Sequence, residues 1–471
     1  MQRWLAWRPS AAFNNVNIRQ KTPAEVESIH AKRKHWHFVS IQPLGEDVLQ
    51  RAKVLRISRI DECLEKENIM QQLRTGVIGA GSVVREIYQY LYAHSDYSSM
   101  LNVDAVAEPN EAQRNWFGET LRIPASRRFE SYQDMLESGR FDAVQVNTPD
   151  HIHAEPAIAA LKAGADVLVP KPTAATVADA HEMIKVARET GRLLLVDYHK
   201  REDPRIKEAE ARYQKGAYGR FQAAVWYMMD KLLVADPNHD PPFFATPDFA
   251  EKNTPVSFLT VHMCDALIRI VRLRPVQARA MGYSHKLPSL KPIAVQGYDL
   301  CDTELLFENG ATAHVITGWH LPNTAHATAV QSSRIICSDG IIDMDLDKPG
   351  YHELHADGIS EVNPLFKNFA ADGTVRGYGM ESPGRLYQRI LAHRNQQLDA
   401  KTVDELLGPF ETGFYTTLVL EAAEKSLETG EMIADGVTSG RHVNLDELLR
   451  EQVGNREADA YMGHNRSRAK D

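Results

Sequence analysis

The stretch from Arg74 to Leu91 has the pattern of an apolar strand, a glycine turn and a helix. The strand ends at Gly79, and apolar residues recur at helical spacing from Ser82 onward. Two glycines in such a turn allow a sharp bend and a close approach of the backbone to an anion, and the start of the helix offers free amide groups. The stretch therefore predicts a dinucleotide-binding turn, with the cofactor-binding residues Gly79, Ala80, Gly81, Ser82 and Val83.

Val84 occupies the position at which dinucleotide-binding turns usually carry a third glycine. That glycine lets the helix pack closely on the strand. The branched side chain of Val84 therefore predicts either a slightly wider contact between helix and strand or a phosphate loop that differs in detail.

Strands and helices continue to alternate in short units up to about residue 200, which predicts a parallel sheet covered on both faces. The carboxyl ends of such strands are where open α/β sheets bind ligands. Residues 70–200 are therefore predicted to form a doubly wound Rossmann domain that binds NAD or NADP. Further strands are expected at 103–107, 143–146, 167–169 and 193–196, followed respectively by Glu108, by 147–153, by Lys171 and by 197–200.

Glu108 follows the second expected strand of this domain. An acid at this position hydrogen-bonds ribose hydroxyls and repels a 2′-phosphate, so Glu108 predicts a preference for NAD over NADP. His151 and His153 either contact the cofactor or cap and orient the next helix. The remaining residues assigned to the cofactor at this strand edge are Asn147, Thr148 and Pro149.

The pattern changes from alternating helices and strands to hairpins after about residue 205. Glu308-Asn309-Gly310 and Asp339-Gly340 each separate two strand-like runs, and Asn-Gly or Asp-Gly supplies the positive φ angles of tight turns. Residues 201–455 are predicted to form a second α/β domain with a large, mainly antiparallel open sheet, through which we expect a homo-oligomer. Helices are expected near 382–398 and 410–428, and a flexible tail over 456–471.

Residues 1–69 show no sustained hydrophobic period. Their first acidic residue, Glu25, follows four basic residues, a pattern found in organellar transit segments. A disordered extension and a start assigned too far upstream are the alternatives we favour, since Met70 stands just before the first expected strand. We expect this N-terminal extension to be dispensable for folding and for cofactor binding.

The composition of the 471-residue chain, 43% hydrophobic and 25% charged, is that of a globular protein with two domains. Its net charge of −9 disfavours nucleic-acid phosphates, and no stretch reaches the length of a membrane span. The four cysteines lie far apart without metal-ligand spacing, which indicates a reducing, cytoplasmic setting and no metal site. A small-molecule ligand is therefore favoured, without a nucleic-acid or membrane partner.

Five motifs, in order along the chain, resemble the family of glucose-fructose oxidoreductase and inositol 2-dehydrogenase (Gfo/Idh/MocA). They are GVIGAGSV (76–83), AVAEPNEAQR (105–114), NTPDHIHAEPAIAALKAGADVLVPKPTA (147–174), HMCDAL (262–267) and EAAEKSLETG (421–430). The resemblance covers residues 73–435. It implies a Rossmann domain, a C-terminal α/β domain with a large open sheet, and NAD(P)-dependent oxidation or reduction of a sugar, cyclitol or related polyol.

By this resemblance two side chains take catalytic roles. Lys171 matches the lysine of the family's Glu-Lys-Pro motif, beside the nicotinamide and the reacting carbon, and a cis bond to Pro172 is implied. His262 matches the histidine that acts as general acid or base on the substrate hydroxyl. Three further residues are assigned to the substrate, although Asp265 has a second possible role in orienting His262: Tyr198, Lys200 and Asp265.

At two positions the chain departs from the family pattern. Pro170 replaces the glutamate of the Glu-Lys-Pro motif. Phe258 stands where the family often carries an aspartate, one helical turn before His262. The second departure removes a carboxylate from the expected proton relay and leaves the cofactor fold unaffected.

The motifs together predict an NAD-dependent oxidoreductase that transfers a hydride between nicotinamide and a polyol carbon. Because the hydroxyl proton must leave with the hydride, the site needs a base near neutrality, and Lys171 and His262 are suitable types. The alternatives are an NAD-dependent glycoside hydrolase of the same family and an NAD-binding regulatory protein without catalysis.

Overall fold

The computed structural model describes residues 72–240, 243–244, 248–348, 351–355, 358–361 and 363–463. All of these residues belong to one compact unit, Gln50–Asp471. The predictions made for residues 1–69 therefore fall outside the described residues. In the described ranges, no helix combines the length and the apolar character needed to cross a bilayer.

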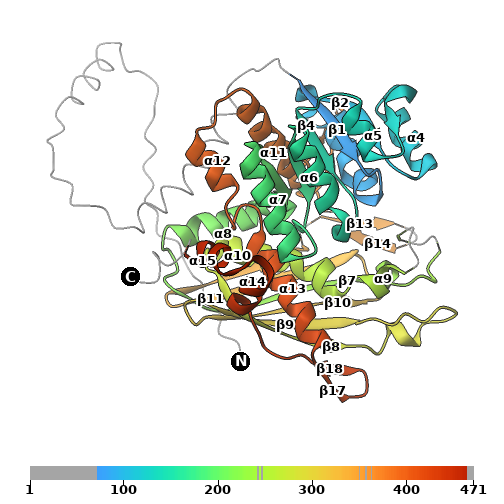
Figure 1. Cartoon of the computed structure of the whole chain (residues 1–471). Coiled ribbons are helices and arrows are strands. Elements are labelled where there is room, and N and C mark those ends of the chain that lie inside the picture. The colour runs from blue at the N-terminus through green and yellow to red at the C-terminus, as the bar shows by residue number, and fades with distance from the viewer. Residues whose placement is uncertain are drawn as a thin grey trace, which may run out of the picture. The chain divides into compact units, whose positions relative to one another are not determined.

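Residues 73–197 form a six-stranded sheet in which every neighbouring pair is parallel (Figure 1). In the spatial order β3-β2-β1-β4-β5-β6, the strands β2 and β3 lie on one side of β1, and β4, β5 and β6 lie on its other side. Dinucleotide-binding folds change side in the same way between the first and the fourth strand. The predicted parallel sheet is confirmed. Its strands are β1 (Leu73–Ile78), β2 (Leu101–Ala107), β3 (Arg128–Phe129), β4 (Ala143–Val146), β5 (Asp166–Pro170) and β6 (Leu194–Asp197).

The helices between these strands begin and end at residues whose side chains or backbone angles suit a helix terminus. Ser131 and Thr176 accept hydrogen bonds from backbone amides of the first turn, and Gly191 ends its helix with φ +64°. Asn110 caps the helix after β2 in the same way. These helices are α4 (Glu111–Thr120), α5 (Tyr132–Glu137), α6 (Ala154–Lys162) and α7 (Val177–Thr190).

The helix after β1 departs from regular α geometry. After one short turn at residues 82–83, a π-helical segment, η1 (Val84–Tyr88), leads into α3 (Gln89–His94). Val84 starts this segment and is fully buried. The missing third glycine thus coincides with a locally widened helix, a feature that often accompanies functional sites.

The second sheet has nine strands and is mixed, because β7 and β10 run parallel at its centre. Its remaining ladders are antiparallel, and the two predicted hairpins form the pairs β9–β10 and β11–β12. The strands are β7 (Phe221–Lys231), β8 (Pro275–Tyr283), β9 (Leu300–Phe307), β10 (Thr312–Leu321), β11 (Ala329–Cys337), β12 (Gly340–Asp345), β17 (Glu431–Ala434), β18 (Val437–Ser439) and β19 (Val443–Asn444).

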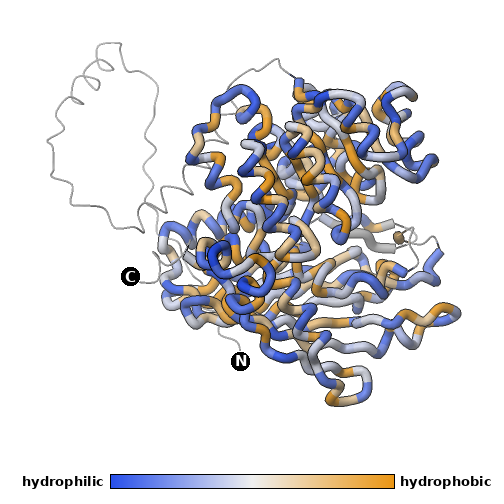
Figure 2. The backbone as a smooth tube through the Cα atoms, in the orientation of Figure 1, coloured by the Kyte–Doolittle hydropathy of each residue, from blue (hydrophilic) through white to orange (hydrophobic). Residues whose placement is uncertain are grey.

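Helices cover one face of the nine-stranded sheet, while no described helix lies on the other face in Figure 1. Along β7 and β11, buried and exposed residues alternate, and Figure 2 shows the matching alternation in hydropathy along the strands. Val225, Ile336 and Ile341 are exposed on the uncovered face. The covering helices are α8 (Pro204–Gln214), α10 (Val261–Val271), α13 (Phe414–Glu428) and α14 (Leu445–Val453).

One helix from the C-terminal part of the chain packs on the parallel sheet instead. Because α5, α6 and α7 all cover the same face, the second face near β5 and β6 needs a cover from elsewhere. That cover is α11 (Tyr378–Arg394), whose Tyr387 hydroxyl donates to Gln145 of β4 at 2.9 Å. Leu386, Tyr387 and Ile390 share a core with Leu168 and Leu195.

The structure corrects the predicted start of the C-terminal tail. Residues Asn455–Gly463 form helix α15, so the chain is ordered beyond 456. The Tyr461 ring stacks on Phe414 with centroids 4.0 Å apart, and its hydroxyl lies 3.1 Å from Nδ1 of His181 on α7. A short amphipathic helix was overlooked because the charged residues around it dominate the sequence pattern.

Candidate active site

The candidate site lies along the carboxyl ends of the parallel strands, where each strand passes into a polar loop. Since the sheet order is β2-β1-β4-β5-β6, the residues that follow these strands form one continuous edge. In spatial order this edge carries Glu108, the turn 79–83, the segment 147–153, Lys171 and the short helix η5 (His199–Glu202).

The glycine turn has the geometry required of an anion-binding loop. Gly79 has φ +87°, and a Cβ there would lie 2.9 Å from the backbone oxygen of Asn147, so only glycine fits. At Gly81 no atom lies within 4 Å of the position that a Cβ would take. Ala80 is buried and Ser82 is exposed, whereas Val83 is partly buried against the hydrophobic core. The open space at Gly81 and the free helix start fit a pyrophosphate.

Glu108 is tied to the glycine turn. Its carboxylate accepts hydrogen bonds from the backbone amides of Ala80 and Asn110, both at 2.8 Å. Arg114, which the sequence analysis did not single out, donates to the backbone oxygen of Glu108. A carboxylate at the end of β2 suits ribose hydroxyls, whereas the guanidinium of Arg114 lies beside it as a positive charge.

The segment after β4 packs closely under the glycine turn. Asn147 donates to the backbone oxygen of Gly79 at 3.5 Å, and Thr148 Oγ1 lies 3.0 Å from Nδ1 of His153. His153 is fully buried, and burial lowers its pKa to about 4. His151 and Pro149 are exposed at the same edge. His153 is therefore part of the packed wall, whereas His151 faces outward.

Lys171 follows β5 and joins Pro172 through a cis peptide bond, as the resemblance implied. Its Nζ donates to the backbone oxygen of Phe258 at 3.2 Å and lies 4.7 Å from the centre of the Phe258 ring. Burial lowers the pKa of Lys171, which nearby Asp150 and Asp230 partly restore. Lys171 thus contacts the backbone carbonyl and the aromatic ring of Phe258, at the position where the family often carries a carboxylate.

His262 lies at the start of α10, directly after a second π-helical segment, η7 (Val256–Thr260). Burial lowers its pKa well below the ordinary value, and the charges of Lys171, His199 and Lys200 lower it further. The rings of His262 and His199 have centroids 5.0 Å apart. His262 is therefore neutral near neutral pH and close to both lysines.

A cavity of about 340 Å³ opens beside these residues. Lys200, one of the predicted substrate residues, lines it and donates to Oε1 of Gln331 on β11. Burial lowers the pKa of Lys200 to about 8. The other lining residues are His199, Met228, His262, Ala327, Thr328, Ala329, Leu346, Asp347, Asn363, Phe366 and Tyr378.

Asp230 at the end of β7 was not recognised from the sequence. It is 6% exposed, and within the described part of the chain its Oδ1 has no hydrogen-bond partner. Burial raises its pKa to about 7, against the opposing effect of Lys171 and Lys200. No local motif marks this residue, because only the fold of β7 against β11 brings it to the lysines.

Asp265 and Tyr198, the other two predicted substrate residues, do not line this cavity. Arg201 binds the Asp265 carboxylate with two hydrogen bonds, at 2.7 and 2.9 Å, and its guanidinium lies 4.5 Å from the centre of the Tyr198 ring. Asp265 is 2% exposed. Its carboxylate is thus held by Arg201 within the protein core.

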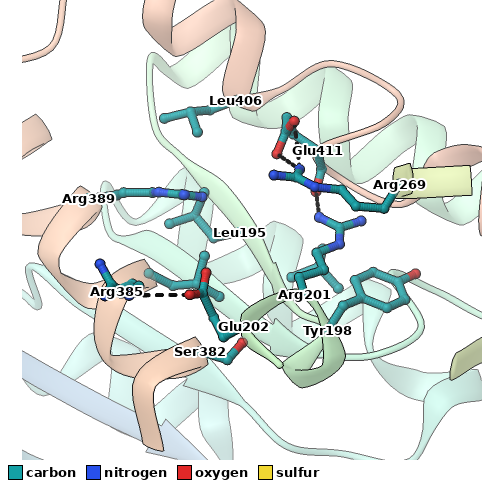
Figure 3. Close-up of a pocket in the computed structure, with 12 residues that line it drawn as sticks. Leu195, Tyr198, Arg201, Glu202, Arg269, Ser382, Arg385, Arg389, Leu406 and Glu411 are labelled. Carbon is teal, nitrogen blue, oxygen red and sulfur yellow. Dashed lines mark hydrogen bonds and ion pairs between the residues drawn. The ribbon is translucent and has the colours of Figure 1, made fainter. Parts of the chain in front are cut away.

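Figure 3 shows the small cavity of about 30 Å³ near Tyr198 and Arg201, which has room for about one water molecule. A buried ionic network adjoins it. Arg269 binds Glu210 and Glu411 at 2.9 and 2.7 Å, and Arg272 binds the same two carboxylates. We define the ionic network as Arg201, Glu210, Asp265, Arg269, Arg272 and Glu411.

Among the described residues, no three His, Cys, Asp or Glu side chains come together as metal ligands. His352 and His355, whose spacing in the sequence is helix-like, belong instead to the strand β13 (His352–His355).

The sheet order and the glycine turn define a dinucleotide-binding α/β protein. Residues 73–198 match the model of the Gfo/Idh/MocA oxidoreductase family, which is described by its NAD-binding Rossmann fold. The Rossmann domain of this chain therefore matches that of the family, as the motifs predicted.

Curated relatives support the same family over part of their own length. A 1,5-anhydro-D-fructose reductase from Ensifer adhaerens is 31% identical over 153 residues, which are 32% of this chain and 44% of that protein. A D-glucoside 3-dehydrogenase from Escherichia coli is 31% identical over 130 residues, or 27% and 35% of the two chains. The chain thus matches less than half of the length of either relative.

Solved structures extend the similarity in fold to the second sheet. An inositol dehydrogenase homologue from Azotobacter vinelandii, complexed with NADH and myo-inositol, superimposes with a TM-score of 0.61 at 18% identity, covering 80% of this chain and 98% of that one. A scyllo-inositol dehydrogenase from Lactobacillus casei gives 0.59 at 16% identity, covering 78% and 99%. At this identity the likeness concerns the fold alone.

Proposed function

We propose that the protein is an NAD-dependent oxidoreductase that transfers a hydride between the nicotinamide and a CH–OH carbon of a sugar, cyclitol or related polyol. The main support is that Lys171 and His262, 91 positions apart in the sequence, come together in the fold: Lys171 Nζ donates at 3.2 Å to the backbone oxygen of Phe258, in the π-helical segment that leads directly into the helix of His262. This site adjoins both the glycine-turn edge and a cavity of about 340 Å³.

The cofactor is held by the edge that runs from Glu108 to Lys171. The turn at Gly81 accepts the pyrophosphate, and Glu108 receives the ribose hydroxyls. Bound nicotinamide supplies the hydride acceptor or donor. We propose that NAD is preferred over NADP, and that Glu108→Ala relaxes the preference by about tenfold, roughly 1.4 kcal/mol. Tighter binding of NADP than of NAD by the unmodified protein, measured by calorimetry, would contradict this preference.

Proton transfer is assigned to His262 and Lys171. In oxidation, neutral His262 accepts the hydroxyl proton, because its lowered pKa leaves a ring nitrogen unprotonated at neutral pH. Lys171 stabilises the developing alkoxide through its Nζ. In reduction, protonated His262 returns its proton to the alkoxide that hydride addition forms, and Lys171 again stabilises this alkoxide.

The cavity favours a ring that carries several hydroxyl groups. Lys200, Gln331 and Asn363 offer donors and acceptors on its wall, while Phe366 and Tyr378, with ring centroids 5.1 Å apart, offer an apolar face. Such a mixture suits a polyol ring, which has polar edges and apolar faces. The relatives named for sugars and the solved structures named for inositols agree with this substrate class.

A cofactor and product assay tests the proposal. Protein and NAD⁺ are mixed with scyllo-inositol, myo-inositol, a D-glucoside and 1,5-anhydro-D-glucitol, and reduced nicotinamide is followed by absorbance. Net NADH that persists with product supports the proposal, whereas glycoside cleavage without net NADH or NAD binding without turnover contradicts it. Gly81→Val is the control, since a branched side chain fills the pyrophosphate space and should abolish NAD binding.

Three wider assignments belong to the same proposal. The uncovered face of the nine-stranded sheet, with exposed Val225, Ile336 and Ile341, is proposed as the contact of a homo-oligomer. The division into a Rossmann domain and a second domain is placed near residue 200, with α11 returning to the first. A reducing, cytoplasmic setting is proposed from the free thiols of three described cysteines, Cys264, Cys301 and Cys337.

A further inference from the structure

Asp230 occupies a position from which its carboxylate can act on the proposed active site. Met228, two residues earlier on the same face of β7, lines the cavity, and so does Ala329, the register partner of Asp230 on β11. Asp230 is 6% exposed, and within the described residues Oδ1 accepts no hydrogen bond. A buried carboxylate oxygen without a partner is costly and therefore unusual in a purely structural position.

Two positive charges act on this carboxylate, and they come from two different strand ends. Lys171 follows β5 and Lys200 lies on η5. Phe258 contributes only its ring and its backbone oxygen to Lys171. Asp150 also acts on Lys171 and raises its pKa more than Asp230 does, but its side chain is 33% exposed, whereas Asp230 is 6% exposed.

We propose that Asp230 is a positioning residue that supplies the negative charge for Lys171 which residue 258 lacks in this chain. The inference deepens the proposed function and rests on it. Asp230 acts through Lys171: it favours the ammonium form and holds Nζ toward the cavity, where the substrate hydroxyl is expected. Asp230 lies on the second sheet, whereas the aspartate that the family often carries at position 258 lies one helical turn before His262.

The charge balance of the site follows from this arrangement. An ionised Asp230 offsets the cost of burying the Lys171 ammonium, so that Lys171 keeps its proton when the alkoxide develops. A protonated Asp230 gives no such support, and Lys171 then loses its proton more readily. The titratable groups that face Asp230, Lys171 or Lys200 from the surrounding elements are Asp150, His153, His199, Asp203, Arg205, His262 and Asp347.

The direct test measures the charge of Lys171 without relying on turnover. Protein labelled with ¹³C at lysine Cε is titrated by NMR without substrate or cofactor, and the Lys171 signal is identified by its loss in Lys171→Arg. In Asp230→Asn the titration midpoint of Lys171 should move to lower pH, since a stabilising negative charge is lost. An unchanged midpoint would overturn the proposal.

Two matched variants make the titration specific. Asp347→Asn removes a cavity carboxylate that acts on Lys200 and not on Lys171, so it should leave the Lys171 midpoint in place. Asp230→Glu keeps the negative charge, so the titration midpoint of Lys171 in this variant should lie close to that of the unmodified protein. If Asp347→Asn shifts the titration midpoint of Lys171 as much as Asp230→Asn does, the shift reflects the total charge of the cavity and not Asp230 in particular. The proposal then fails.

The turnover number kcat provides a second, independent test of the role of Asp230. Asp230→Asn should lower kcat by roughly tenfold while the KM for NAD⁺ stays unchanged, as for residues that orient a catalytic group. Phe258→Asp in the Asp230→Asn background places a carboxylate next to Lys171 and should restore part of kcat. Turnover by the unmodified protein with no effect of Asp230→Asn contradicts the inference alone. No NAD binding or turnover by the unmodified protein contradicts the proposed function, and the NMR titration still decides the role of Asp230.

Discussion

The described part of the chain contains, among its buried charged side chains, two clusters whose members differ in how burial changes their pKa values. In the ionic network, Glu210 and Glu411 raise the pKa of Arg269 despite burial, and the arginines lower the pKa of Glu411 well below its ordinary value. In the cavity cluster, which we define as Lys171, His199, Lys200, Asp230 and His262, burial prevails. It lowers the pKa of each lysine and histidine, and it raises that of Asp230 to about 7.

The difference lies in pairing, because both clusters are removed from water. Each carboxylate of the ionic network receives hydrogen bonds from an arginine at 2.7 to 3.1 Å, whereas Oδ1 of Asp230 receives none from the described residues. Paired groups stay charged and serve the structure. Groups without close partners shift toward neutrality, where they can exchange protons near physiological pH.

The largest effect is expected in the ionic network. Glu411→Gln leaves the two buried arginines Arg269 and Arg272 with Glu210 as their one remaining carboxylate in the network, and it should lower the free energy of unfolding by about 3–5 kcal/mol at pH 7. The lowered pKa of Glu411 means that its contribution is complete above about pH 4.5 and is lost as the pH falls further. Urea denaturation at pH 7 and pH 4 measures both quantities.

The exposed pair Lys185–Glu182, at 2.9 Å, provides the control for this measurement. Glu182→Gln should change the free energy of unfolding by less than about 1 kcal/mol, because water screens the pair. An equally small effect of Glu411→Gln would mean that pairing does not distinguish the two clusters.

A pH-dependent effect is expected for His153, which is buried near Lys171. Burial lowers its pKa from 6.5 to about 4, so the folded state loses stability as the pH falls from 6.5 toward 4. His153→Gln removes this titration. Between pH 7 and pH 4.5 the unmodified protein should lose roughly 2–3 kcal/mol more than the variant. If the free energy of unfolding falls by the same amount in both proteins between pH 7 and pH 4.5, His153 is not held neutral in the folded state.

The smallest effect on stability is expected for Lys171. Among the described residues no carboxylate forms a hydrogen bond or ion pair with the buried ammonium, so Lys171→Met should leave the free energy of unfolding within about 1 kcal/mol of the unmodified value at pH 7, or raise it. The same urea measurement applies. A loss of about 3 kcal/mol or more would place Lys171 with the ionic network as a structural charge.

The cofactor edge was predictable from the sequence because its chemistry is local. Gly79, Gly81 and Glu108 lie next to strand ends that the hydrophobic pattern already marks, and a parallel sheet brings such ends to one edge. The two hairpin turns were predicted for similar reasons, from Asn-Gly and Asp-Gly, whereas the cis bond at Lys171 was implied by the family resemblance alone.

The cavity and the ionic network were not predictable in the same way. Asp230 and Gln331 acquire their positions from the register of β7 with β11, and α11 covers the parallel sheet from a distant part of the chain. Asp265 was assigned to the substrate because its place on the helix is visible in the sequence, whereas its partner Arg201, 64 residues away, is not. Such contacts are set by tertiary structure, on which no local pattern reports.

A double-mutant cycle on Lys171 and His262 tests the central claim most directly, namely that the two side chains act on one hydroxyl. With a substrate from the polyol assay, each of Lys171→Ala and His262→Ala should lower kcat by about 10²-fold with the NAD affinity nearly unchanged. The double variant should be only slightly slower than the slower single variant, because two residues that act as one unit cannot be removed twice. Losses that multiply to about 10⁴-fold, or a fully active His262→Ala, would contradict the account.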